Sequence, residues 1–320
     1  MLKRPSFWMI LAFTLVFALV PLVRDDANQR ETLILIAIAI ALASNLNLMI
    51  GYTGYVNFGN AVFFGLGGYI GLYLTTVKKW PLTASALAAG IVVTLFALVL
   101  GLAILRLRGS YFALATIGVL EAVQAFVTNF NPWGRSSGMY VSMDTYAPLG
   151  GPMRAVWTAY LLVVGVMGLS LLLSLFIKNS KFGLGLFAIR EDEDAAVVLG
   201  VNATLYKARV YAISAFLPAV VGVLVFFKNG MIDPSGAFDL TVSIEAIVMM
   251  MLGGQGTVAG AVVGAALYEQ LRGYLLTSPS LSSFHLVIAG GLLLIIILFA
   301  PEGLIGWLYH LLPKTRKVLE

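Results

Sequence analysis

The chain has no cysteine and very little charge. Among its 320 residues, Asp, Glu, Lys and Arg together make up 11%, whereas hydrophobic residues make up 60%. The lack of cysteine excludes a disulfide framework, a thiolate metal site and a cysteine nucleophile. Ordinary globular proteins carry about 25% charged residues. A soluble enzyme of this composition would therefore have too few polar residues to cover its surface. Intrinsic disorder is excluded as well, because it requires low hydrophobicity.

Several chemical motifs are also missing. There is no Gly-x4-Gly-Lys-[Ser/Thr] loop, so the chain has no such nucleotide site of its own. There is no His-Glu-x-x-His or Gly-x-Ser-x-Gly, and His285 and His310 are isolated. We therefore predict no enzymatic activity, no bound metal and no cofactor.

Long apolar runs are what the chain has instead. A bilayer core about 30 Å thick needs about 20 mainly apolar residues in a helix. Runs of that kind predict spans at 7–23, 33–50, 60–77, 84–105, 111–129, 156–177, 210–228 and 284–300. Residues 243–276 are expected to form a re-entrant or paired half-helix unit. The predicted fold is an all-α, polytopic transmembrane helical bundle, with residues 1–320 as a single domain.

The positions of Lys and Arg predict the orientation. With the N-terminus inside, 12 of the 20 Lys and Arg residues face the cytoplasm, including those near both termini. The loop at 178–209 is then cytoplasmic and the loop at 131–154 external. The net charge of +5 is better explained by this membrane orientation than by nucleic-acid binding. A cleaved signal peptide is the alternative for the first span, but no small-x-small cleavage pattern follows it.

Glycines interrupt the apolar run near residues 51–60. Glycine weakens a helix by about 1 kcal/mol per residue, and broken helices often line transport sites. The segment is therefore a candidate translocation path. Its candidate residues are Gly51, Thr53, Gly54, Asn57, Gly59 and Asn60. The following glycines at 65–71 are better explained by close helix packing.

A second glycine interruption weakly repeats the first. Gly253, Gly254 and Gly256 follow a short apolar arm at Ser243–Leu252. Glycine-broken segments in corresponding positions are typical of transporters built from two repeated halves. We expect two pseudo-repeated halves around a central path, although a coincidence of glycines would give the same pattern.

Four ionisable residues fall in or beside apolar stretches. Charges in a bilayer are costly, so each is a candidate functional residue. Glu269 and Arg272 are three residues apart on one helical face and are expected to pair, and Glu245 is nearby in the second broken segment. Glu121 has no sequence-near partner and is a candidate for the path.

The cytoplasmic loop at 178–209 is the most charged part of the chain. Apolar residues flank its charges, which suggests a short amphipathic helix that docks into a partner's groove. A solvated loop is the alternative. The candidate residues for docking are Arg190, Glu191, Glu193, Asp194, Ala195, Ala196 and Gly200.

Four ordered motifs resemble the permease subunits of branched-chain amino-acid ABC transporters. They are Gly51-Tyr-Thr-Gly-x-Val-x-Phe-Gly-x-Ala-x-Phe-Phe-Gly-x-Gly-Gly-Tyr69, Leu107-Arg-Gly-Ser-Tyr-Phe-Ala-Leu-Ala-Thr116, Ala188-Ile-Arg-Glu-Asp-Glu-Asp-Ala-Ala-x3-Gly200, and Ile244-Glu-Ala-Ile-Val-x-Met-x-Leu-Gly-Gly-x-Gly256. The likeness covers about residues 33 to 303 and is closer to the longer, M-type subunit.

The resemblance implies a multi-pass permease of the bacterial inner membrane. It implies a second permease subunit, two cytoplasmic ATPase subunits that bind ATP, and an extracytoplasmic solute-binding protein. It also implies that Asp194-Ala195-Ala196-x3-Gly200 is a Glu-Ala-Ala-x3-Gly coupling motif with Asp in place of Glu. The carried solute would be a branched-chain amino acid or a similar small polar solute.

Some positions depart from the family pattern. Tyr55, Asn57 and Asn60 stand where the family often has Gln, Ser and His. Urea, short amides and other amino acids therefore stay open as solutes. An autonomous secondary transporter or channel is the alternative from a different class.

Overall fold

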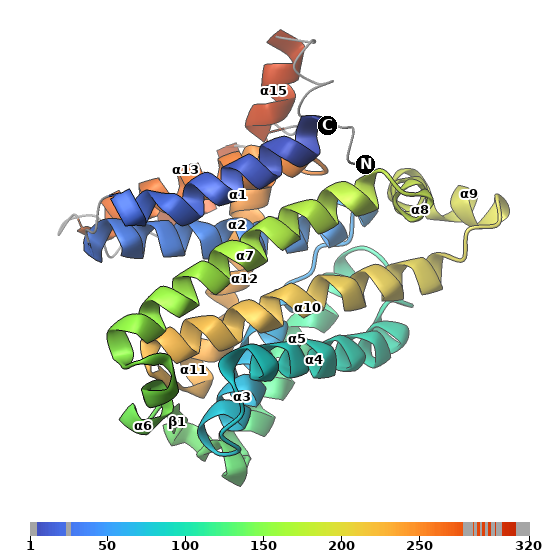
Figure 1. Ribbon diagram of the computed structural model, residues 1–320. Helices are drawn as coiled ribbons and strands as arrows, with labels where there is room; N and C mark the ends of the chain where they lie inside the picture. Colours follow the sequence, from blue (N-terminus) through green and yellow to red (C-terminus); the bar gives the residue numbers. More distant parts are fainter. Residues whose placement is uncertain are drawn as a thin grey trace.

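The computed structural model describes residues 5–23, 27–277, 284, 287–288, 290–291, 294–295, 298 and 303–311. Its long helices are α1 (Pro5–Val23), α2 (Ala27–Thr53), α3 (Asn60–Thr76), α4 (Leu82–Ile104), α5 (Ser110–Asn129), α7 (Pro152–Lys178), α10 (Ala203–Asn229), α12 (Leu240–Gly253) and α13 (Val258–Thr277). Shorter helices are α6 (Met143–Tyr146), α8 (Lys181–Glu191), α9 (Glu193–Val198), α11 (Pro234–Ala237) and α15 (Gly303–Leu311). The polytopic helical bundle is confirmed (Figure 1).

Helix α10 packs along α3 and α4. Its contact with α3 is made through glycines on both helices. A Cβ at Gly67 would lie 2.3 Å from the carbonyl oxygen of Ala219, and one at Gly222 would lie 2.0 Å from that of Phe64. Two helix backbones can approach this closely only where no side chain separates them. The glycines at 65–71 are therefore packing residues, as the sequence favoured.

Helix α2 packs against α7, α10, α12 and α13. From Ile34 to Thr53 nearly every side chain of α2 is buried, including the polar Ser44, Asn45 and Asn47. A mainly apolar helix that is buried on all sides occupies the interior of a bundle. The end of α2 is therefore held by protein and not by lipid.

Helices α12 and α13 form an antiparallel hairpin. A Cβ at Gly264 of α13 would lie 1.9 Å from the carbonyl oxygen of Met249 of α12, so the two backbones touch. The paired unit predicted for 243–276 is present, but its first arm is longer than the ten residues expected. Helices α11 and α12 together form a stretch, Pro234–Gly253, that is long and apolar enough to cross a bilayer.

Six stretches of the described residues have the length and apolarity of membrane spans: α2, α4, α5, α7, α10 and Pro234–Gly253. Helix α1 is apolar but shorter, and α3 has 17 residues, fewer than the ~20 that a full crossing needs. The span predicted at 284–300 lies largely outside the described residues.

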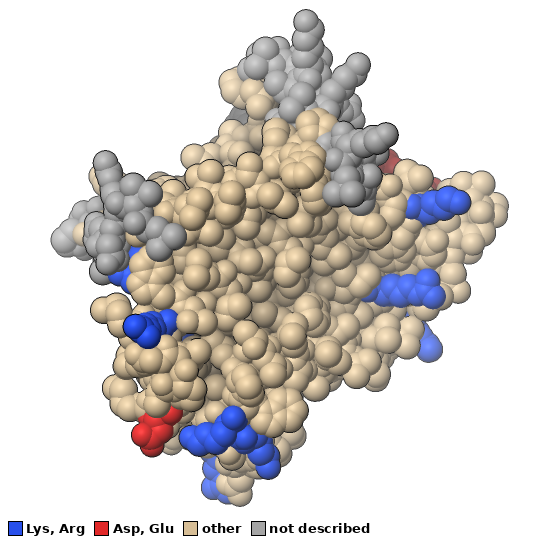
Figure 2. Space-filling view, viewed as in Figure 1, with Lys and Arg blue, Asp and Glu red and all other residues tan. Residues whose placement is uncertain are grey.

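On the face of the molecule shown in Figure 2, the charged residues lie away from the middle of the bundle. Figure 2 shows a broad band free of Lys, Arg, Asp and Glu, with charges gathered toward opposite ends. Helices α8 and α9 lie at one end, and α6 and strand β1 at the other (Figure 1). Such a band is the pattern of a chain that crosses a membrane.

The loop predicted at 131–154 is not free of structure. It contains η1 (Asn131–Trp133), η2 (Arg135–Ser137), β1 (Met139–Tyr140), α6 and η3 (Ala147–Leu149). Strand β1 pairs antiparallel with β2 (Met231–Ile232), Met139 opposite Ile232. This two-residue ladder is a small departure from an all-α fold, and it ties the loop to the end of α10.

Candidate functional site

The interruption between α2 and α3 is a non-helical segment at residues 54–59, which we call the extended segment. Tyr55, Asn57 and Gly59 are buried in it, Val56 and Phe58 are half-buried, and Gly54 is exposed. The backbone of the segment is satisfied by side chains of other helices: Thr116 Oγ1 of α5 accepts from the Phe58 amide at 3.1 Å. Ser243 of α12 donates to the Phe58 carbonyl at 2.7 Å and accepts from the Ala61 amide at 3.0 Å. Irregular backbone at membrane depth is tolerated only where protein or a water-filled cavity surrounds it. These hydroxyls therefore hold the segment inside the bundle.

The two glycine interruptions meet in space. Asn47 of α2 accepts a hydrogen bond from the Gly256 amide at 2.8 Å and donates one to the Thr257 carbonyl at 3.0 Å. A Cβ at Gly51 would lie 2.6 Å from the Gly256 nitrogen. Gly51 and Gly256 are thus joined in one backbone contact that leaves no room for side chains.

Arg190 of α8 joins the same contact. Its Nη1 donates to the Gly51 carbonyl at 2.6 Å, and a Cβ at Gly256 would lie 3.0 Å from it. The sequence places Arg190 with the partner-docking residues. The structure places its guanidinium inward, on the end of α2, so Arg190 binds the interruption within its own chain.

The remaining candidate path residues have different surroundings. Gly54 and Gly254 have φ values of +75° and +125°, which favour glycine at the ends of α2 and α12. Thr53 donates to the Met49 carbonyl of its own helix, and Asn57 accepts from the Gly59 amide. Gly253 packs α12 on α13, since a Cβ there would lie 1.7 Å from the Gly260 carbonyl oxygen.

Asn60 differs from these residues because its side-chain amide nitrogen makes no hydrogen bond within the described part of the chain. The side chain is only 2% exposed, and its Nδ2 has no hydrogen-bond partner among the described residues. It begins α3, where helix N–H groups point toward the extended segment. A buried donor without a partner is costly in folding free energy, so this donor is a candidate contact for a polar solute.

Glu121 lies apart from both interruptions. It is exposed on α5, on a face that also presents Leu114, Gly118, Ala122 and Ala125. The structure does not bring Glu121 together with the residues at 51–60 within this chain. Because α5 has the composition of a membrane span, an exposed carboxylate on it needs a neighbour other than lipid.

The charged loop folds as two helices and not as the single helix expected. Asp192 separates α8 from α9 and caps α9, accepting from the amides of Asp194 and Ala195 at 2.9 and 3.0 Å. Ala196 is buried in a small apolar cluster with Ile189 and Ala203. This cluster fixes α9 to the start of α10.

Glu193 of α9 points into the protein. Its Oε1 accepts from Nζ of Lys207 at 2.8 Å, and its Oε2 accepts from the hydroxyl of Tyr55 at 2.5 Å. Burial raises the pKa of the Glu193 carboxyl, but the hydrogen bonds from Lys207 and Tyr55 outweigh this and hold the pKa below its ordinary value. Glu193 therefore joins α9 to the extended segment, at Tyr55.

The other loop residues face outward. Glu191, Asp194, Ala195 and Gly200 are exposed. Asp194 forms a bidentate pair with Arg108 from the α4–α5 connection, at 2.9 and 3.1 Å, and this guanidinium lowers the pKa of the Asp194 carboxyl. Gly200 has a φ of +90° and open space around its Cα.

Comparison with known proteins identifies the family. The family model described as "Branched-chain amino acid transport system / permease component" matches residues 30–297. The chain belongs to this permease family. No solved structure matches.

The relatives of this permease include proteins named LivM and proteins named LivH. It is 27% identical to the high-affinity branched-chain amino acid transport system permease protein LivM of Salmonella typhimurium, covering 88% of this chain and 69% of the relative. It is 25% identical to LivH of Escherichia coli K12, covering 87% and 92%. It is also 24% identical to the ribose import permease protein RbsC of Haemophilus influenzae, over 60% and 59%.

The permease has a second cluster of charges between α12 and α13. Arg272 lies 3.0 Å from Glu245 and 3.4 Å from Glu269, so the pairing expected for Glu269 and Arg272 is confirmed and Glu245 joins it. The cluster borders a cavity of about 140 Å³ whose other walls are mainly apolar side chains of α2, α3 and α10. Mutual pairing of these charges offsets part of the cost of burying them inside the bundle.

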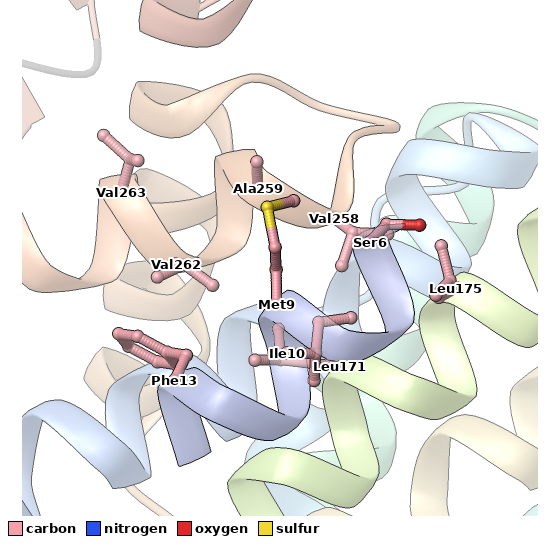
Figure 3. Close-up of a pocket in the computed structure, with 10 residues that line it drawn as sticks. All are labelled: Ser6, Met9, Ile10, Phe13, Leu171, Leu175, Val258, Ala259, Val262 and Val263. Carbon is pink, nitrogen blue, oxygen red and sulfur yellow. The ribbon is translucent and has the colours of Figure 1, made fainter. Parts of the chain in front are cut away.

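An apolar groove of about 240 Å³ lies between α1, α7 and α13 of the permease (Figure 3). Met9 extends from α1 toward Ala259 of α13, Ile10 lies beside Leu171 of α7, and Ser6 supplies the only hydroxyl among the described lining residues. The groove includes none of the candidate path residues. It has the character of a hydrocarbon-facing surface and not of a polar solute site.

Four residues at the site were missed by sequence analysis: Asn47, Tyr55, Lys207 and Arg108. Asn47 lies with Ser44 and Asn45 inside an otherwise apolar run, and Lys207 lies beside Arg209 at the start of another. A polar side chain inside an apolar run was an available signal for Asn47. Nothing in the sequence connected Tyr55 with Glu193, which lies 138 residues away.

Proposed function

We propose that this permease is the membrane subunit of an ATP-binding-cassette importer. It pairs with a second permease, takes its driving force from two cytoplasmic ATPases and receives solute from an extracytoplasmic binding protein. Membership of the family supports the importer assembly. The relatives' names support branched-chain amino acids or a similar small polar solute as its cargo. Because the ribose permease is also related, the solute is the part of the proposal that binding measurements must decide.

The observation that carries the proposal is the exposed apolar end of α9. Val198 and Leu199 are 86% and 82% exposed at the end of the bundle where the two interruptions meet. Figure 1 shows α8 and α9 there, beyond the end of α7. Apolar side chains this exposed, next to the exposed Asp194 and Gly200, favour a protein partner that covers them. We assign this end to the ATPase and therefore to the cytoplasm.

The proposed solute path runs along 51–60 and the α12–α13 turn. The Asn60 amide and the glycine backbones supply polar groups, and Glu121 on the exposed face of α5 would line the path against the second permease. The location of the start of α1 and of α15 at the α8 end in Figure 1 supports cytoplasmic termini. The chain would be multi-pass in the bacterial inner membrane.

The test is co-purification of the permease with the ATPase subunits of its own organism after co-expression. Leu199→Asp removes exposed apolar surface that the fold does not use, so the chain should insert and fold but lose the ATPases. Met143→Asp is the matched control, because Met143 is 75% exposed at the opposite end. ATPases that bind equally well to the Leu199→Asp variant would exclude this docking surface.

The same preparation separates the importer from an autonomous transporter. In proteoliposomes, the complete assembly should accumulate solute only with ATP, and the permease alone should not move it. Solute equilibration by the isolated chain without ATPases would support the secondary transporter or channel. Titration of the extracytoplasmic binding protein with leucine, urea, short amides and ribose then identifies the solute.

A further inference from the structure

Lys207 of α10 is a buried cation outside the predicted docking motif. Its side chain is 1% exposed, and its Nζ donates to Glu193 Oε1 at 2.8 Å and to the Tyr55 hydroxyl at 2.9 Å. The same ammonium lies 4.4 Å from the centre of the Tyr55 ring. A buried ammonium is stable only when it is paired and hydrogen-bonded in this way.

The contacts around Lys207 join four separate parts of the chain. Tyr55 belongs to the extended segment, Glu193 to α9, Lys207 to α10 and Arg108 to the α4–α5 connection. Arg108 lies 3.6 Å from Glu193 and 2.9 Å from Asp194, so two cations face two carboxylates and the cluster is neutral. We call Tyr55, Glu193 and Lys207, with Arg108 and Asp194 at their edge, the Lys207 cluster.

A second polar contact joins the charged loop to the first glycine interruption. Arg190 of α8 donates to the Gly51 carbonyl at 2.6 Å, and Gly51 touches the α12–α13 turn at Gly256. Helix α9 is therefore bonded to the extended segment at Tyr55, while α8 is bonded to the end of α2 at Gly51. The exposed end of α9 and both interruptions belong to one connected set of polar contacts.

We infer that Lys207 is a positioning residue that transmits movement of α8 and α9 to the extended segment at 54–59. The inference rests on the proposed function, since α9 must be the element that the ATPase moves. With the cluster intact, α9 cannot shift without carrying Tyr55, because Glu193 holds both Tyr55 and Lys207. Without the cluster, the apolar cluster of Ile189, Ala196 and Ala203 still folds α9, but the bond to the extended segment is lost.

The decisive variant is the double substitution Lys207→Met with Glu193→Gln. A single change would leave a buried charge without its partner and so risk misfolding, whereas removing both charges is often neutral for stability. The neutral pair also cannot reproduce the charge-assisted bonds to Tyr55. The double variant therefore separates transmission of movement from folding.

The matched control is a lysine–glutamate pair at the other end of α10. Lys228 lies 2.5 Å from Glu31, and this pair contacts neither interruption nor α9. Lys228→Met with Glu31→Gln removes one lysine and one glutamate charge, the lysine again from α10 and the glutamate from α2. Transport by this control should equal that of the unmodified protein.

The experiment measures solute accumulated and ATP hydrolysed by the complete assembly in proteoliposomes, with the stability of each variant from thermal unfolding. In the Lys207→Met, Glu193→Gln variant the ATPases should still co-purify, while solute transported per ATP falls by about fivefold or more, the low end of usual coupling between sites. Transport per ATP equal to that of the control would overturn the inference. If the single variants lose stability and the double variant recovers both stability and transport, the cluster is structural only. Failure of the unmodified permease to bind ATPases would instead contradict the proposed function.

Discussion

Asn47 on α2 binds the turn between α12 and α13 with both ends of its side-chain amide. It accepts from the Gly256 amide and donates to the Thr257 carbonyl, 209 and 210 residues away in the sequence. A single side chain thus holds the two glycine interruptions together. The contact also places Gly51 against Gly256, where Arg190 bonds to the same backbone.

Replacing Asn47 by alanine should destabilise the chain. The Gly256 amide and the Thr257 carbonyl would lose their partners, and each buried unpaired group costs about 1–3 kcal/mol. Thermal unfolding in detergent should show a lower midpoint for Asn47→Ala. Asn129→Ala is the control, because Asn129 is exposed and its side chain, within the described part of the chain, bonds to the Ala125 carbonyl of its own helix. Equal midpoints for the two variants would show that the contact adds nothing to stability.

Gly67→Ala should disrupt the packing of α3 on α10. The added Cβ would lie 2.3 Å from the Ala219 carbonyl oxygen and 2.4 Å from its Cα, and backbone atoms cannot move aside as a side chain can. Overpacking of this kind costs about 1–3 kcal/mol. Gly165→Ala on α7 is the control, since nothing lies within 4 Å of its added Cβ. A chain that tolerates alanine at both positions would contradict the close approach of the two helices.

The contribution of Glu193 to the stability of α9 should depend on pH. Its folded-state pKa is lowered, so its contribution to stability is present above the ordinary pKa of 4.5 and is lost as pH falls through the folded value. Hydrogen exchange at the amides of α9 should therefore be slow at neutral pH, after correction for intrinsic rates, and should lose protection well below pH 4.5. In Glu193→Gln, protection in α9 should already be weaker at neutral pH. An identical pH profile in both proteins would show that Glu193 is not the titrating group.

Glu121→Gln should change transport and leave folding unchanged. The side chain is exposed on α5, so the fold does not depend on its charge. Movement of a solute along a path beside it would depend on that charge. Uptake kinetics of the complete assembly measure the first effect and thermal unfolding the second. Glu31→Gln supplies an exposed glutamate away from α5 for comparison. Uptake unaltered by Glu121→Gln would remove Glu121 from the path.

The sequence predicted the helices well because each has its own local signal. Apolar runs gave α2, α4, α5, α7 and α10 to within a few residues, except at the starts of α2 and α10, where polar and charged residues before the apolar run are already helical. The glycines at 51–54 and 253–256 marked where helices end. The division into α8 and α9 was not predicted, because the cap at Asp192 is one polar residue among four acidic ones.

What the sequence by itself determined is the kind of molecule: a membrane bundle with two glycine interruptions and a charged loop. These features follow from composition and spacing, which act locally along the chain. Only the tertiary structure decided that Asn47 joins the interruptions, that Arg190 and Glu193 face inward, and that Lys207 binds Tyr55. The physical reason is that a hydrogen bond or an ion pair requires two groups at one place, and the packing of helices distant in sequence brings them there.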